Sequence, residues 1–315
     1  MARNTSSNVA LPDSSQNEMS GRPLVLNLLT SLRPAQWTKN LLVFAGLIFG
    51  RKVFTPAIVE AVAAFAIFCG LSGAVYLIND VLDRENDRRH PLKAKRPIAS
   101  GAVSVSTASA TAVVLAAASL LAAFALNVRF GLVAATYIGL QVLYSGPLKH
   151  IVIIDVLTIA IGFVLRAVAG AMAIEVEISH WLLVCTILLA LFIALAKRRH
   201  ELTLLAGQAS SHRPILGEYS EELLDQMIAV VTASTLIAYV FYTISPETQQ
   251  KFGTPWLGLT IPFPLYGIFR YLYLIHQRAG GGSPADLLLA DRPLLACVAL
   301  WALMVALIIY QPLMP

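Results

Sequence analysis

The chain has 315 residues, of which 57% are hydrophobic and only 13% are Asp, Glu, Lys or Arg. A soluble domain carries about 25% charged residues, so this chain has too few charges to cover a surface that faces water, and lipid must surround most of it. The formal net charge is +5. Because the basic residues are spread between apolar runs, they indicate the positive-inside bias of membrane proteins and exclude a nucleic-acid surface.

The N-terminal segment differs in composition from the rest of the chain. Residues 1–22 are rich in Ser, Asn and Pro and contain no apolar stretch like the core of a signal peptide. We therefore expect residues 1–30 to form a flexible polar cytoplasmic tail and residues 31–315 to form one transmembrane domain.

Apolar runs that approach the length needed to cross a bilayer, about 20 residues, recur after this tail. Prolines such as Pro147, Pro255 and Pro293 separate them. The runs lie near 38–50, 53–78, 103–126, 130–146, 151–174, 180–196, 226–245, 256–276 and 293–313. The predicted fold is therefore all-α, a polytopic membrane protein with about nine transmembrane helices.

Lys and Arg residues are concentrated on one side of the predicted membrane. With a cytoplasmic N-terminus, seventeen of the 23 fall in cytoplasmic segments, four fall in segments on the other side, and Arg166 and Arg270 lie within spans. This bias predicts a multi-pass protein of the cell (inner) membrane with its N-terminus in the cytoplasm. An odd number of helices then places the C-terminus on the opposite side.

The clearest chemical motif is NDVLDREND at 79–87, where the second predicted helix ends. If the helix continues through the motif at about 100° per residue, Asp80, Asp83 and Asp87 lie within roughly 60° of one another. Three carboxylates at this spacing repel each other unless a cation lies among them. Magnesium prefers hard oxygen ligands from carboxylates and substrate phosphates, so these three acids are predicted to be catalytic metal ligands.

A basic segment follows the acids directly and includes Arg88, Lys95 and Arg96. Carboxylates that hold a metal, next to cations that bind the remaining phosphate oxygens, suit a metal-bridged polyphosphate. The alternative for the acids is a solvated helix end with ordinary i,i+4 ion pairs, such as Asp80 with Arg84. The alternative for the cations is that they bind no substrate and belong only to the positive-inside bias of cytoplasmic loops.

Further polar residues fall on the same predicted side of the membrane. YSGPLK at 144–149 ends the fourth helix, and Asp155 lies near the start of the fifth. An ionisable residue at membrane depth is usually functional, so Arg166 either binds phosphate in a cavity or is a structural arginine capped by carbonyls from a neighbouring helix. KRRHE at 197–201 is either a membrane-edge anchor or a second phosphate subsite, and Lys39 opens the first helix.

At these residues the sequence resembles the UbiA superfamily of intramembrane prenyltransferases. The 79–87 segment matches the pattern NDxxDxxxD, and the nine predicted helices agree with the family fold, a bundle around a central cavity open to the cytoplasmic side. Within the superfamily the resemblance is strongest to members that use a decaprenyl-type phosphate. It rests on RPAQWTKN at 33–40, HPLKAKRPIASG at 90–101, YSGPLK at 144–149, KRRHEL at 197–202 and DRPLL at 291–295.

The resemblance implies transfer of 5-phosphoribose from phosphoribosyl pyrophosphate, taken from the cytoplasm, to a polyprenyl phosphate, taken from the bilayer. Pyrophosphate is released, and Mg²⁺ on Asp80, Asp83 and Asp87 is required. The residues predicted to bind substrate are Lys39, Asn79, Arg88, Lys95, Arg96, Tyr144, Lys149, Asp155, Arg166, Lys197 and Arg198.

One departure from the family pattern separates the alternatives. Members that use a prenyl diphosphate usually carry a second acidic motif, DxxxD, whereas Asp155 is followed four residues on by Ile159. This weighs against transfer of a polyprenyl group from its diphosphate to an aromatic acceptor such as 4-hydroxybenzoate. A non-catalytic lipid-phosphate carrier or flippase would need basic residues deep on both sides, which the one-sided charge distribution disfavours.

Overall fold

The computed structural model describes residues 22–90, 93–204, 214–277, 287–288 and 290–311, and within these ranges all regular structure is helical. This confirms the predicted all-α class. The chain divides into two compact units, residues 1–38 with 66–122 and residues 39–65 with 123–315, and each is described separately below.

The helices are α2 (Leu24–Ser31), η1 (Pro34–Phe44), α3 (Ala45–Phe49), α4 (Ala57–Leu82), α5 (Arg84–Arg89), η2 (Lys93–Lys95), α6 (Pro97–Ser100), α7 (Val105–Leu126), α8 (Val128–Ser145), η3 (Leu148–His150), α9 (Ile154–Ala173), α10 (His180–Leu204), η4 (Pro214–Glu218), α12 (Glu221–Ile244), α13 (Pro246–Phe252), η5 (Trp256–Thr260), α14 (Pro262–Gln277) and α16 (Arg292–Tyr310), where η marks a 3₁₀ helix.

Seven of the described helices, α4, α7, α8, α9, α10, α12 and α16, are long and apolar enough to cross a bilayer. The predicted count of nine is not confirmed, because two predicted segments are divided. The segment 38–50 falls in the 3₁₀ helix η1 and the short helix α3, and the segment 256–276 falls in η5 and the 16-residue α14. Proline lacks the backbone N–H that continues a helix, so α14 begins at Pro262.

Part of the predicted tail is helical. Residues 24–30 lie in α2, and the other predicted tail residues except 22 and 23 lie outside the described residues, so that a flexible cytoplasmic tail stays a prediction for them. The sequence LVLNLLTS of α2 is short but strongly apolar, and its residue Leu28 packs against the core of the first unit together with Leu32, which follows the helix. That core consists of Leu77, Ile98, Val103, Ala108 and Ala112.

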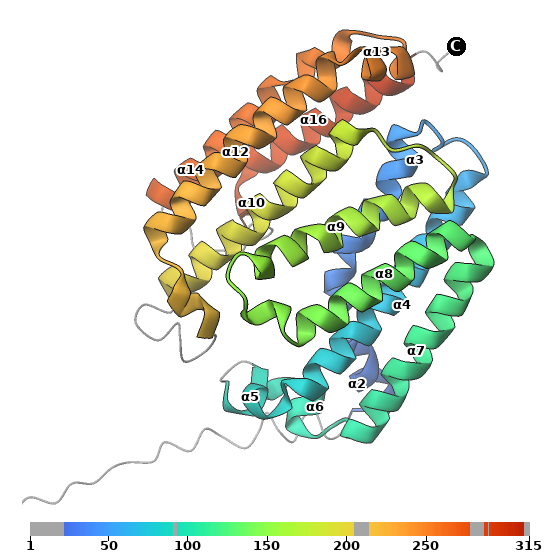
Figure 1. The fold of residues 1–315 in the computed structure, drawn as a ribbon, viewed down its shortest axis with the longest axis vertical. Coiled ribbons are helices and arrows are strands. Elements are labelled where there is room, and N and C mark those ends of the chain that lie inside the picture. The colour runs from blue at the N-terminus through green and yellow to red at the C-terminus, as the bar shows by residue number, and fades with distance from the viewer. Residues whose placement is uncertain (1–21, 91–92, 205–213, 278–286, 289, 312–315) are drawn as a thin grey trace, which may run out of the picture. The chain divides into compact units, whose positions relative to one another are not determined.

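In the second unit, helices α8, α9, α10 and α12 pack in chain order, and α14 packs against α16 (Figure 1). Helix α9 approaches η1 and α3 at backbone distance. A Cβ atom at Gly170 would lie 1.8 Å from the carbonyl oxygen of Val43, and one at Gly46 would lie 2.9 Å from Cα of Ala171. The absence of a side chain at these two positions therefore permits the packing.

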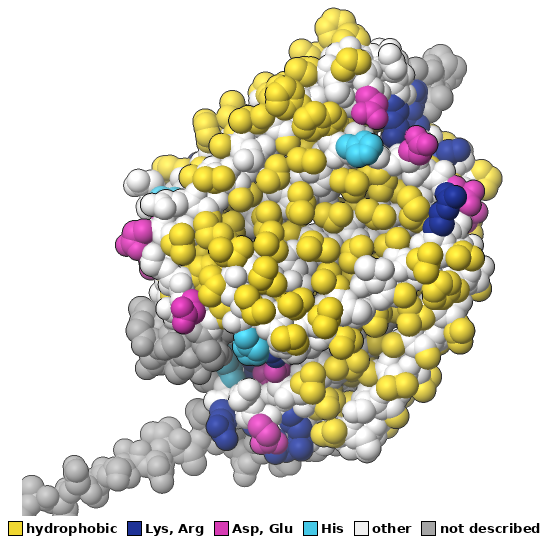
Figure 2. Space-filling model, viewed as in Figure 1, with side chains coloured by type: hydrophobic (Ala, Val, Ile, Leu, Met, Phe, Trp, Pro, Cys, Tyr) yellow, Lys and Arg dark blue, Asp and Glu magenta, His cyan; other side chains and the backbone are white. Residues whose placement is uncertain are grey.

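The outer surface of the helices is apolar. On α7, the side chains of Val113, Val114 and Leu121 are 66%, 68% and 72% exposed. On the face shown in Figure 2, hydrophobic side chains cover most of the surface and charged side chains lie near its edges. A surface of this kind is stable only in lipid, which agrees with the low charge content.

Replacement of Gly170 by Ala is expected to destabilise the protein, because the added methyl group would overlap the Val43 carbonyl and push α9 away from η1. Overpacking of this kind costs about 1–3 kcal/mol. Gly139→Ala on α8 is the matched control, since nothing lies within 4 Å of its Cβ position, and its effect should stay within about 1 kcal/mol. The measurement is the Tm of the detergent-solubilised protein; equal Tm values for the two variants would contradict the packing described.

Candidate active site

The acid segment lies at the C-terminal end of α4. Helix α4 stops at Leu82 and α5 starts at Arg84, but the i→i−4 hydrogen bonds continue through the junction, from Asp83 N to Asn79 O (2.9 Å) and from Asp87 N to Asp83 O (2.8 Å). Asp80 and Asp87, two turns apart, therefore lie on one side of the helix. Both are buried, with 2% and 3% of their surface exposed.

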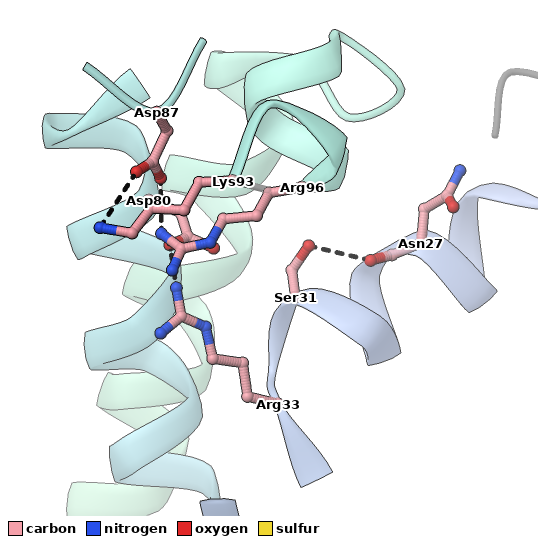
Figure 3. A network of polar contacts seen from close by, with 7 residues as sticks. All are labelled: Asn27, Ser31, Arg33, Asp80, Asp87, Lys93 and Arg96. Atoms are coloured by element: carbon pink, nitrogen blue, oxygen red, sulfur yellow. Dashed lines mark hydrogen bonds and ion pairs between the residues drawn. The ribbon is translucent and has the colours of Figure 1, made fainter. Parts of the chain in front are cut away.

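A single guanidinium joins these two acids. Arg96 Nη1 donates to Asp80 Oδ1 at 3.1 Å and to Asp87 Oδ2 at 2.5 Å (Figure 3). Two further cations complete the group: Arg33 Nη2 donates to Asp80 Oδ1, and Lys93 Nζ lies 4.0 Å from Asp87 Oδ1. We call these five residues, all of the first unit, the acid–base cluster.

The alternative pairing of Asp80 with Arg84 is not the one observed. Arg84 Nε donates instead to the carbonyl of Ile98 at 3.4 Å, and Arg88 Nε donates to the carbonyl of Ala99 at 3.0 Å. Both arginines thereby hold the short helix α6 against α5, and this contact places Arg96, the residue before α6, against the acids. Arg88 has a structural contact, and its predicted contact with substrate stays a prediction.

The predicted triad is not a preassembled metal site. Within the described residues, no group of three His, Cys, Asp or Glu side chains is placed to hold a metal ion. Asp80 and Asp87 nevertheless converge on one cation. This arrangement fits Mg²⁺, which usually takes one or two protein carboxylates and completes its shell with water and substrate phosphates.

In the second unit, Arg166 is 6% exposed and is bound by neutral groups. Its Nε donates to Asn40 Oδ1, its Nη1 to the Gly162 carbonyl and its Nη2 to the Tyr137 hydroxyl, each at 2.8 Å. The guanidinium also stacks over the rings of Tyr137 and Phe163. The one carbonyl among these groups belongs to its own helix, whereas the structural alternative expected carbonyls from a neighbouring helix. Phosphate binding by Arg166 stays a prediction.

A second buried ion pair joins α9 to α10. Arg198 Nε donates to Asp155 Oδ2 at 3.0 Å and Nη1 donates to Glu201 Oε2 at 2.8 Å; Asp155 and Arg198 are 0% and 2% exposed. The Tyr219 hydroxyl donates to Asp155 Oδ1 at 2.9 Å and accepts from Ile153 N at 2.8 Å. Burial raises the pKa of Tyr219 to about 12, so the neutral phenol is the donor at physiological pH.

The hydrogen bonds that join Arg198, Asp155, Tyr219 and Ile153 stabilise the backbone at the start of α9. Ile153 immediately precedes α9 and has a φ of 70°, a left-handed conformation that is unfavourable for a β-branched residue. The hydrogen bond from its N–H to Tyr219 helps to hold it there. Asp155 and Arg198 therefore fix the start of α9, and their predicted contact with substrate stays a prediction.

The UbiA prenyltransferase family model matches residues 40–285, more than three quarters of the chain. The chain belongs to the UbiA prenyltransferase family. It is 31% identical to the decaprenyl-phosphate phosphoribosyltransferase of Corynebacterium glutamicum, over 90% of this chain and 86% of that protein. It is 33% identical to the protein of the same name from Mycolicibacterium smegmatis, over 88% of this chain and 91% of that protein.

Solved structures support the UbiA fold. The structure of a UbiA homolog from Archaeoglobus fulgidus bound to GPP and Mg²⁺ superposes with a TM-score of 0.69, over 90% of this chain and 99% of that chain. At 21% identity this likeness shows the fold alone. Together with the family match it confirms the predicted fold class, and the family membership makes the chain a membrane-bound transferase.

The remaining predicted ligands of this UbiA member are less enclosed. Lys39, Lys95 and Lys197 are exposed, and Asn79, Tyr144 and Lys149 are half-buried. Lys197 lies 3.9 Å from Glu201 in an exposed i,i+4 pair, as expected of a membrane-edge residue. These six positions stay predictions as substrate ligands.

Two residues that contact predicted site residues escaped the sequence analysis. Arg33 lies 47 positions before its partner Asp80, and Tyr219 lies 64 positions after Asp155. The only signal for Arg33 was its place in the string RPAQWTKN, which carried the family resemblance. No local pattern pointed to Tyr219.

Replacement of Asp155 by Leu should lower the free energy of unfolding by about 3–5 kcal/mol, because Arg198 would keep only Glu201 as an acidic partner. The double variant Asp155→Leu with Arg198→Met should recover much of that loss, since it removes both buried charges. Both the loss and the recovery are measured as changes in the Tm of the protein in detergent. Lys197→Met removes only the outer contact of Glu201 and leaves the contact between Glu201 and Arg198 in place, so it should change stability by less than about 1 kcal/mol. Equal Tm values for the single and double variants would contradict the structural role of Asp155 and Arg198.

Proposed function

We propose that this protein transfers 5-phosphoribose from phosphoribosyl pyrophosphate to a decaprenyl-type polyprenyl phosphate and releases pyrophosphate. The observation that carries the proposal is the acid–base cluster, which gathers two buried carboxylates and three cations at the end of an apolar helix. A metal-bound pyrophosphate needs both kinds of group. The names of the curated relatives, which cover about nine tenths of the chain, support the same reaction.

The proposed reaction needs little general acid or general base catalysis from the protein. A polyprenyl phosphate is ionised near neutral pH, so its oxygen can attack the anomeric carbon while the bond to pyrophosphate breaks and the electron pair leaves with the pyrophosphate. Asp80 and Asp87, with Asp83 at the helix junction, would hold Mg²⁺, which when bound neutralises charge on the leaving group. Arg96 and Lys93 point at the same place and would bind pyrophosphate oxygens.

The arrangement around Asp155 favours this reaction over prenyl transfer to an aromatic acceptor. A site for that reaction in this family carries a second acidic motif, of which only Asp155 is present here. Its carboxylate is occupied by Arg198 and Tyr219. Ile159 stands where that motif places its second acid, so Asp155 alone cannot form the acidic pair that a second metal cluster needs.

We further propose that phosphoribosyl pyrophosphate arrives from the cytoplasm, that the N-terminus lies on that side, and that the protein resides in the inner membrane. The Lys and Arg bias supports this orientation. Seven spans and nine spans are both odd, so either number places the C-terminus on the opposite side. A reporter fused after Pro315 should therefore be active only outside the cytoplasm.

The reaction can be tested with purified protein in detergent, Mg²⁺, labelled phosphoribosyl pyrophosphate and decaprenyl phosphate. Label should pass into a lipid product, and chelation by EDTA should stop the transfer until Mg²⁺ is restored. A prenyl diphosphate with 4-hydroxybenzoate, incubated in parallel, should yield no product. Product from the second mixture alone would overturn the proposal.

Asp80→Asn should lower kcat by about 100-fold or more, because the neutral amide cannot replace the carboxylate as a metal ligand and the stabilisation of the leaving group is lost. Glu85→Gln is the matched control, since Glu85 is an acid of the same segment with a side chain 69% exposed, and it should stay within about twofold of wild type. Normal turnover by Asp80→Asn would refute the metal role.

A further inference from the structure

Helix α2 buries two polar residues and exposes several apolar ones. Asn27 and Ser31 are buried, at 3% and 2% exposure, whereas Val25, Leu26 and Leu29 are 68%, 46% and 45% exposed. Figure 3 shows Asn27 and Ser31 joined on this helix, where Ser31 Oγ donates to the Asn27 carbonyl. A helix with this orientation presents its outer face to lipid.

That outer face borders a groove of about 540 Å³. Leu26, Leu29 and Thr30 line it at spacings of i, i+3 and i+4, which place them on one helical stripe, and Arg33 lines it from just beyond the helix. The Thr30 hydroxyl donates to the Leu26 carbonyl at 2.8 Å, so it is satisfied within the helix. The groove therefore has a mainly apolar wall, continued by Pro34 and Ala35, with Gln36 as a further polar residue and Arg33 as its one charged residue.

The one charged residue that lines the groove is also part of the acid–base cluster. Arg33 follows α2 with a φ of 52°, and this left-handed turn directs its side chain to Asp80 and over the ring of Tyr76, 5.0 Å from its centroid. The side chain keeps 28% of its surface exposed. Of the five N–H donors of a guanidinium, only Nη2 makes a side-chain hydrogen bond within the described residues.

We propose that this groove binds the polyprenyl phosphate, with the isoprene units nearest the phosphate against Leu26 and Leu29 and the phosphate on Arg33. The inference rests on the proposed function and names the place of its acceptor. An apolar groove lined by a single cation complements a single chain that carries its phosphate directly. A diacyl phospholipid, with two chains and a glycerol between them and the phosphate, matches it less well.

The size and position of the groove agree with this occupant. A volume of about 540 Å³ lies within the range of roughly 300–1,000 Å³ typical of small-ligand pockets, so it suits the phosphate and the first isoprene units while the rest of the chain stays in the bilayer. Arg33 contacts Asp80 directly, so a phosphate on Arg33 lies beside the carboxylates that are proposed to hold the metal and the donor.

The test uses the full-length protein in nanodiscs and a decaprenyl phosphate with a photoactivatable group near its phosphate, without phosphoribosyl pyrophosphate. Cross-links should map to residues 24–36. Leu29→Trp, which fills the groove, should weaken binding about tenfold, and Leu29→Ala, which removes part of the wall, should weaken it less. Val25→Trp is the matched control: Val25 is exposed on the same helix but does not line the groove, and binding should be unchanged.

Steady-state kinetics distinguish lipid binding in the groove from the transfer reaction itself. Leu29→Trp should raise the KM for decaprenyl phosphate about tenfold and leave the KM for phosphoribosyl pyrophosphate unchanged, and Arg33→Gln should also weaken binding of the lipid. Unchanged affinity in both Leu29 variants, or equal cross-linking by a phosphatidic acid probe, would overturn the groove but leave the reaction standing. Cross-links in the groove without any phosphoribosyl transfer by the wild type would instead overturn the proposed function alone.

Discussion

Neutralisation of charge at the edge of a membrane is the constraint on which this structure depends. A carboxylate or guanidinium removed from water is costly unless an opposite charge or several dipoles surround it. The acids Asp80 and Asp87 are buried against Arg33, Arg96 and Lys93, and Asp155 is buried against Arg198. These contacts tie segments far apart in the sequence, so the same interactions that make the buried charges tolerable also position helices α2, α6 and α9.

The two charged groups differ in a way that bears on function. In the second unit, one cation, Arg198, faces two carboxylates, those of Asp155 and Glu201, and Arg166 is surrounded by neutral acceptors. In the acid–base cluster, three cations face two carboxylates. The surplus of positive charge favours an anionic ligand before any metal binds, and a divalent ion on the carboxylates would increase that surplus. A polyphosphate suits such a place, whereas the group around Arg198 has no surplus of positive charge and serves the fold.

Hydropathy and spacing predicted the features that are local in sequence. The apolar runs, the acid segment and the family resemblance all follow from residues within a few turns of one another. The division of 38–50 and 256–276 was missed because mean hydropathy measures affinity for lipid and not the continuity of a helix. The choice of Arg96 as the cation between Asp80 and Asp87, and of Arg33 and Tyr219 as partners, depends on how helices pack. The spacing predicted that Asp80 and Asp87 share one side of the helix. It held no information on which cation would lie between the two carboxylates.

Arg33 connects the two substrates of the proposed reaction. Its left-handed backbone costs roughly 1–2 kcal/mol, and strained residues of this kind are retained where the surrounding structure holds them. Here the strain directs one guanidinium toward both the apolar groove and Asp80. A phosphate bound to the remaining N–H groups of Arg33 would share its positive charge with Asp80 and so leave that carboxylate more available to a metal ion. Occupation of the groove and coordination of the metal would then favour each other, so that the donor is activated where the acceptor is already in place and water has less opportunity to take the phosphoribose.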